Sequence, residues 1–220
     1  MSENPVDAGT YWDSRFNAEG MIWGEQPSKT AYLALDHFRG QDINKLLVPG
    51  SGYGRNTRLF SSSGFMVTGV EISAVACGIA AGFDPQTRLF NNSVLDMTAD
   101  AEIYDAVYCF NVLHLFREAQ RKQFIEQCLE RIKAGGLMFF TVFSEVEESF
   151  EKGENVEWNT FESKPGRPVH YFTEEDLRNH FIGADILETG LVDDPEDHGE
   201  GPHVHRLRYI YLKVKNEIRI

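Results

Sequence analysis

Short apolar runs alternate with segments of helical pattern over residues 44–143. The apolar runs predict strands at residues 45–49, 65–71, 87–90, 104–110 and 137–143. Helices are predicted between these strands, at residues 54–62, 73–82 and 117–133. A strand that is followed by a helix and then by another strand is typical of a parallel sheet with helices on both faces. The pattern therefore predicts an α/β fold.

The C-terminal part of the chain has a less regular pattern. Residues 144–172 are acidic and rich in glycine and proline, which predicts an irregular insert at the rim of the sheet. A capping box that begins at Thr173 predicts one more helix. Two apolar runs, 185–192 and 206–214, predict a hairpin that closes the sheet. An acidic, histidine-containing loop at residues 193–205 is expected to connect the two runs.

The charge balance is acidic, with 21 Lys and Arg residues against 34 Asp and Glu residues and a formal net charge of −13. A surface that binds nucleic acid or an anionic membrane needs basic residues, so we expect neither partner. The three cysteines are scattered and include no CxxC pair, which suggests neither a disulfide framework nor a zinc site. We expect a cytoplasmic monomer or homodimer, with an N-terminal segment at residues 1–43 and one domain at residues 44–220.

Gly50, Gly52 and Gly54 form a GxGxG sequence between the first predicted strand and the first helix of the domain. Glycine is needed where the chain turns sharply and a ligand approaches the backbone. Glu71 ends the next strand, where nucleoside-binding folds place an acid that accepts hydrogen bonds from ribose hydroxyls. These features predict a nucleoside site, and the alternative is a tight turn beside an incidental glutamate. The NAD pattern GxGxxG would place its third glycine at Arg55.

The GxGxG spacing resembles that of the class I S-adenosylmethionine-dependent methyltransferases. Residues 104–114 are similar to the fourth-strand motif of that family, residues 133–139 to the turn into its fifth strand, and residues 92–96 to its adenine-contacting loop. The resemblance implies a Rossmann-like class I methyltransferase fold, with a seven-stranded, mostly parallel sheet, one antiparallel strand and helices on both faces. Val48 departs from the family, which usually has an acid two residues before the first glycine.

The resemblance also implies the cofactor, S-adenosyl-L-methionine, and the residues that hold it. These residues lie in the glycine loop and directly after the second, third and fourth strands: Gly50, Gly52, Gly54, Glu71, Ile72, Ser93, Val94, Leu95 and Asn111. The position of Val48 implies that another group holds the amino group of the cofactor.

The N-terminal segment is similar to that of the tellurite-resistance and thiopurine methyltransferase group. The similarity rests on Tyr11-Trp-Asp-Ser-Arg-Phe16, Trp23-Gly24 and Pro27-Ser28. In that group an aromatic segment folds over the cofactor site, and an aromatic face suits a sulfonium cation. Trp23 is therefore a candidate cofactor contact. The alternative is that these aromatic residues only attach the segment to the core.

Candidate acceptor-side residues lie beyond the carboxyl ends of the strands. His114 follows the fourth strand, and His170 and Tyr171 lie in the insert on the same rim. His203 and His205 alternate on an extended chain, so both can point to one side. We take His114, Tyr171, His203 and His205 as catalytic candidates, against the alternative that each is a packed or solvated structural residue.

The loop at residues 193–205 has more than one interpretation. A solvated hairpin loop is the plainest, and contact with a substrate is the second. His198, His203 and His205 could also hold a metal together with a carboxylate. The sequence does not decide between them, and we assign no metal site from it.

The combined features predict a methyltransferase that uses S-adenosylmethionine and acts on a small molecule. Methyl transfer needs alignment and exclusion of water, and a soft nucleophile such as a thiol or a chalcogen anion needs little help from a base. This explains why no catalytic triad is visible in the sequence. The alternatives are a protein methyltransferase, an NAD-dependent oxidoreductase and a non-catalytic protein that binds the cofactor.

Overall fold

The computed structural model describes residues 7–198 and 201–215. Seven strands form one sheet in the order β3-β2-β1-β4-β5-β10-β9. Their bounds are β1 Lys45–Pro49, β2 Met66–Glu71, β3 Arg88–Asn91, β4 Tyr104–Phe110, β5 Ile132–Phe143, β9 Asp185–His198 and β10 Gly201–Lys213. Strand β10 runs antiparallel to both of its neighbours, and the pairs among β1 to β5 are parallel. The predicted fold class is confirmed.

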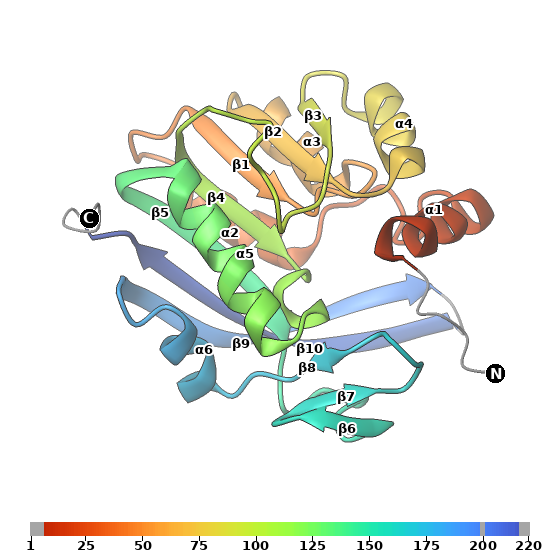
Figure 1. The fold of residues 1–220 in the computed structure, drawn as a ribbon. Helices are drawn as coiled ribbons and strands as arrows, with labels where there is room; N and C mark the ends of the chain where they lie inside the picture. Colours follow the sequence, from red (N-terminus) through yellow and green to blue (C-terminus); the bar gives the residue numbers. More distant parts are fainter. Residues whose placement is uncertain (1–6, 199–200, 216–220) are drawn as a thin grey trace.

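Helices cover both faces of the sheet, as Figure 1 shows. They are α1 Ala8–Glu19, α2 Lys29–Phe38, α3 Arg55–Ser62, α4 Ala74–Phe83, α5 Glu118–Arg131 and α6 Glu174–His180, with a short 3-10 helix at Leu113–Leu115. On one face, Phe124 of α5 and Leu177 of α6 pack in a core with Phe140 of β5. On the other face, Leu35 of α2 and Phe60 of α3 pack in a second core with neighbouring strand residues.

The last helix–strand unit predicted within residues 44–143 differs slightly from the expectation. Helix α5 ends at Arg131, and β5 begins directly afterwards at Ile132 rather than at Leu137. Burial explains the change, because the side chain of Ile132 lies in the core and its backbone pairs with Tyr104.

No helix in the described part of the chain is long and apolar enough to cross a membrane.

The prediction of a loop at residues 193–205 is wrong, because most of that segment belongs to β9 and β10. These strands pair in continuous register from Gly201 opposite His198 to Leu207 opposite Val192. Leu207 also pairs with Phe143, the last residue of β5, so the hairpin extends well beyond the rest of the sheet. In Figure 1 its tip reaches toward the side where α1 lies. The buried carboxylate of Glu196 in β9 pairs with the buried guanidinium of Arg55, which stabilises the extended hairpin.

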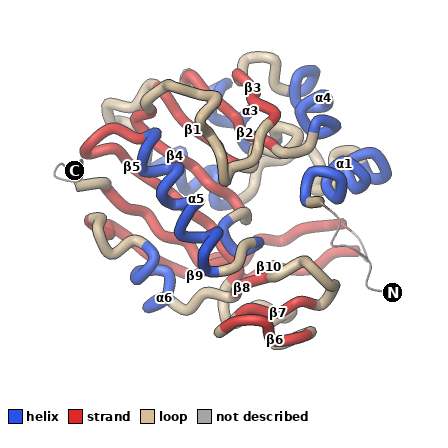
Figure 2. The backbone as a smooth tube through the Cα atoms, in the orientation of Figure 1, coloured by secondary structure: helices blue, strands red, loops and turns tan. Residues whose placement is uncertain are grey.

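The insert at residues 144–172 is also more ordered than its sequence indicates. It forms a separate three-stranded sheet of β6 Glu154–Glu157, β7 Thr160–Glu162 and β8 Val169–His170. Figure 2 shows this small sheet beside the long hairpin, below it in that view. The insert returns to the main fold at Phe172, whose backbone N–H donates to the carbonyl of Phe143 at 2.9 Å.

Candidate functional site

The glycine loop joins β1 to α3, and each of its three glycines has a positive φ angle. These angles are 69° at Gly50, 56° at Gly52 and 98° at Gly54, a region that side chains other than glycine rarely adopt. A Cβ atom at Gly50 would lie 2.2 Å from Cγ2 of Val112. A Cβ atom at Gly52 would meet no atom within 4 Å. The loop therefore needs glycine for its shape and leaves open space above its centre.

Glu71 lies beside this loop, as its place in the sequence predicts. Its side chain is 6% exposed, and both carboxylate oxygens accept backbone hydrogen bonds. The N–H of Gly52 donates to Oε2 at 2.8 Å, and the N–H of Ser73 donates to Oε1 at 2.9 Å. Burial raises the pKa of Glu71, and these two hydrogen bonds act in the opposite direction. An acidic acceptor is thus held in a fixed position at the carboxyl ends of β1 and β2.

The loop after β3 adds a second wall to this region. The side chain of Asn91 donates to the carbonyls of Glu71 and Ile72, each at 2.9 Å. The hydroxyl of Ser93 accepts a hydrogen bond from the N–H of Leu95 at 3.2 Å. The side chain of Val94 is buried in the core. A contact between Val94 and a cofactor would therefore come from its backbone.

Asn111 directly follows β4 and has a φ angle of 54°. Its backbone N–H donates to the carbonyl of Thr141 at 3.0 Å. Its side-chain oxygen Oδ1 is buried and has no hydrogen-bond partner among the described residues. A buried acceptor without a partner is costly, so this atom fits a ligand that supplies a donor. The amino group of a methionine-like ligand is such a donor.

The N-terminal segment is attached to the glycine loop through Tyr53. The Tyr53 hydroxyl donates to the carbonyl of Gly24 at 2.6 Å and accepts from the N–H of Trp23 at 3.1 Å. The rings of Trp23 and Tyr53 are stacked, with their centroids 6.1 Å apart. Farther along, the hydroxyl of Ser73 donates to Asp13 of α1 at 2.6 Å. Neither Tyr53 nor Asp13 was predicted as a site residue, although the aromatic residue inside a glycine loop was a visible signal.

A buried ion pair attaches the long hairpin to the same loop. Arg55, the first residue of α3, donates from Nη2 to Oε1 of Glu196 at 2.7 Å, and both side chains are buried. The Nη1 group of Arg55 also donates to the carbonyl of Trp23 at 3.1 Å. One guanidinium thus connects the glycine loop, the N-terminal segment and β9. In the sequence, Arg55 was considered only because it occupies the place of a glycine in the NAD pattern, and Glu196 was not predicted.

Three of the four catalytic candidates surround Phe143 at the end of β5. The ring of His114 stacks on Phe143 at 4.2 Å, and the ring of His205 lies 5.0 Å from Phe143. The ring of Tyr171 lies 6.2 Å from it, and the Tyr171 hydroxyl donates to Ser149. His203 is next to His205, with 4.6 Å between the ring centroids. The structure therefore brings these four residues together on one rim.

His114 is fully enclosed in this arrangement. Its side chain is 2% exposed, and burial lowers its pKa to about 3, with a further contribution from His205 and His170. The imidazole is therefore neutral at neutral pH. A group with so low a pKa is a weak general base, so it can orient an acceptor but removes a proton poorly.

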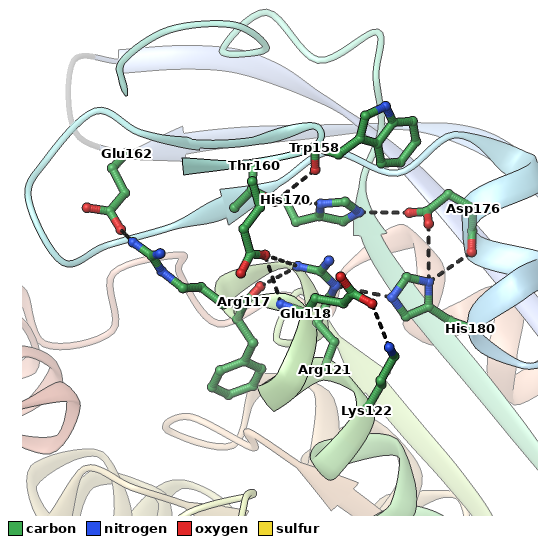
Figure 3. A network of polar contacts seen from close by, with 12 residues as sticks. Arg117, Glu118, Arg121, Lys122, Trp158, Thr160, Glu162, His170, Asp176 and His180 are labelled. Atoms are coloured by element: carbon green, nitrogen blue, oxygen red, sulfur yellow. Dashed lines mark hydrogen bonds and ion pairs between the residues drawn. The ribbon is translucent and has the colours of Figure 1, made fainter. Parts of the chain in front are cut away.

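The expectation that His170 faces a substrate is wrong, because both of its ring nitrogens are engaged in the network of Figure 3. Nδ1 is paired with the hydroxyl of Thr160 at 2.8 Å, and Nε2 with Oδ2 of Asp176 at 2.7 Å. In the same network Arg121 of α5 donates to Nε2 of His180 at 3.2 Å. His170 therefore attaches the insert to α6, and the network continues to α5.

Known proteins share the family and the fold of this chain. A family model described as a methyltransferase domain matches residues 29–185. No curated protein sequence matches the chain. A structure from a study on the conversion of a disulfide bond into a thioacetal group during echinomycin biosynthesis has a TM-score of 0.76 at 16% identity, over 96% of this chain and 93% of that chain.

Two further solved structures are similar over most of the chain. TehB from Haemophilus influenzae has a TM-score of 0.64 at 14% identity, over 94% of this chain and 67% of that chain. A 1,6-didemethyltoxoflavin-N1-methyltransferase from Burkholderia thailandensis has a TM-score of 0.68 at 18% identity, over 97% of this chain and 93% of that chain. At such low identity these similarities show a shared fold.

The family model covers well over half of the chain, and its span includes the glycine loop, Glu71 and Asn111. These residues were predicted from the sequence to hold the cofactor. The chain belongs to the methyltransferase domain family.

Proposed function

We propose that this protein is an S-adenosylmethionine-dependent methyltransferase that acts on a small molecule. The observation that carries the proposal is the buried carboxylate of Glu71, fixed by the N–H groups of Gly52 and Ser73 beside a glycine loop with open space above it. A carboxylate in this position can accept hydrogen bonds from both hydroxyls of a ribose. The bound cofactor would supply a methyl group on a sulfonium centre.

The residues around the loop fit the other parts of this cofactor. The unpaired Oδ1 of Asn111 suits the amino group of the methionyl part, and so takes over the task of the acid that Val48 replaces. Ile72 and the loop of Ser93, Val94 and Leu95 suit the adenosine part. The face of Trp23 and its neighbours suits a cation and excludes water. Each of these assignments follows from the position of the residue relative to Glu71 and the glycine loop.

We further propose that the acceptor is a soft nucleophile, such as a thiol or a chalcogen anion. The low pKa of His114 supports this choice, because this histidine, which follows β4, is a poor proton acceptor. His114, Tyr171, His203 and His205 would orient the acceptor around Phe143. The structural similarity to enzymes of echinomycin and toxoflavin chemistry also supports a small-molecule acceptor. The aromatic motif of the N-terminal segment supports membership in the tellurite-resistance and thiopurine methyltransferase group.

Replacement of Glu71 by alanine is expected to weaken the binding of S-adenosylmethionine about tenfold, because charge-assisted hydrogen bonds to the ribose are lost. Isothermal titration with S-adenosylmethionine measures the change. Glu162→Ala is a suitable control, because this residue lies in the insert and pairs with Arg117 instead. Equal affinity of the Glu71→Ala variant and the wild type would refute the assignment of this carboxylate.

A further inference from the structure

Three histidines lie together near the tip of the β9–β10 hairpin. His198 ends β9, and His203 and His205 lie on β10 across from it. One ring nitrogen from each of the three lies within 4.8 Å of the other two. None of the roles assigned so far accounts for this convergence.

The hydrogen bonds of His203 and His205 determine which ring nitrogen carries the proton. Nδ1 of His203 lies 2.8 Å from the carbonyl oxygen of Gly201, which can only accept. Nδ1 of His205 lies 2.8 Å from Oε1 of Glu147, which also accepts when ionised. Both Nδ1 atoms are therefore donors, and in the neutral rings both Nε2 atoms carry lone pairs.

These two Nε2 atoms face one another at 3.1 Å. Two lone pairs at this distance repel unless a proton or a metal cation lies between them. In a tetrahedral zinc site with Zn–N bonds of about 2.0–2.1 Å, two nitrogen ligands are roughly 3.3 Å apart. The observed separation is therefore close to that of two ligands of one ion.

His198 supplies the third ligand. Its Nε2 atom is buried and has no hydrogen-bond partner within the described parts of the chain, 7–198 and 201–215. Its ring lies 4.5 Å from that of His203, between centroids. An unpaired buried nitrogen beside two converging nitrogens is explained if all three bind the same cation.

Glu147 fixes the orientation of the His205 ring. Its side chain is buried, and its second oxygen, Oε2, accepts from the N–H of Arg206 at 2.5 Å. A carboxylate that accepts from the far nitrogen of a histidine is a common arrangement around protein-bound zinc, because it fixes the ring and increases the basicity of the ligand.

We propose that His198, His203 and His205 bind one zinc ion, and that its open fourth position takes the anionic sulfur or other soft atom of the methyl acceptor. Three protein ligands with one open position are typical of reactive zinc sites, whereas structural zinc sites have four. The location of the three histidines agrees with contact to the acceptor, because His205 stacks on Phe143 beside His114. The role of the zinc ion in acceptor binding rests on the proposed function, whereas the zinc site itself does not depend on it.

The test uses the full chain without a histidine tag, freed of metal by dialysis against a chelator. Zinc binding is measured by isothermal titration, and cobalt binding by visible absorption, since tetrahedral cobalt absorbs intensely and octahedral cobalt weakly. We expect one equivalent of either ion and tetrahedral cobalt bands. Glu147→Gln is expected to weaken zinc binding by about 10–100-fold. His203→Gln is expected to weaken it further.

His37→Gln is the matched control, because His37 lies in α2 and stacks on Tyr211 instead. It should bind zinc as the wild type does. Addition of 2-mercaptoethanol to the cobalt protein should produce a sulfur-to-cobalt charge-transfer band. Absence of stoichiometric zinc binding, or weak octahedral cobalt bands in the wild type, would overturn the site even if the variants fail to fold. Metal binding without the charge-transfer band would overturn only the role in acceptor binding.

Discussion

The Arg55→Met variant is expected to lose about 3–5 kcal/mol of its unfolding free energy, because the substitution leaves the carboxylate of Glu196 buried without its partner. The loss has a second source, since the guanidinium also donates to the carbonyl of Trp23. Urea-induced unfolding at neutral pH measures the effect. The N-terminal segment and the hairpin should both detach more easily from the glycine loop.

Two further variants distinguish this explanation from a general effect of charge. Lys122→Met removes an exposed pair with Glu118 and should change stability by no more than about 0.5 kcal/mol. The double variant Arg55→Met with Glu196→Leu should recover most of the lost stability, because an apolar pair leaves no buried charge behind. An effect of Arg55→Met as small as that of Lys122→Met would show that the ion pair does not hold the hairpin.

The second large effect is expected in acid. The folded pKa of His114 is about 3, whereas the usual value is 6.5, so between these pH values the unfolded chain binds a proton that the folded chain excludes. Stability is therefore fully present above pH 6.5 and decreases as the pH falls. The expected slope from this one residue is about 1.4 kcal/mol per pH unit.

The variant His114→Gln isolates this contribution, because glutamine is polar and does not titrate. Its unfolding free energy is compared with that of the wild type by urea titration at several pH values between 4 and 8. The difference between the two proteins should shift in favour of the variant as the pH falls below 6.5. A difference that stays constant over this range would show that the pKa of His114 is the same in the folded protein as in the unfolded chain, and would refute the effect of burial.

The strands β1 to β5 and the glycine loop could be predicted because their determinants are local. Leu137 to Phe143 are apolar except for Thr141, and Gly50, Gly52 and Gly54 lie at the positions where the chain takes positive φ angles. Glu71 follows from its place at the end of a strand. These features depend on residues that are close together in the sequence.

The long hairpin and the ordered insert could not be predicted in the same way, because distant partners stabilise them. Glu196 pairs with Arg55, and the backbone N–H of Lys29 donates to Oδ1 of Asp194, so both contacts join residues that are far apart in the sequence. The polar composition of residues 193–205 therefore suggests a loop when it is considered alone. The alternation of His203 and His205 with Val204 and Arg206 was the available signal for a strand.

The central claim is that the rim formed by the glycine loop and Glu71 binds S-adenosylmethionine. Isothermal titration of the wild-type protein with S-adenosylmethionine, S-adenosylhomocysteine and NAD tests it most directly. We expect micromolar binding of the two sulfur-containing nucleosides and no heat with NAD. Binding of NAD alone would contradict the account, because it would refute the interpretation of the glycine spacing on which the cofactor assignment depends.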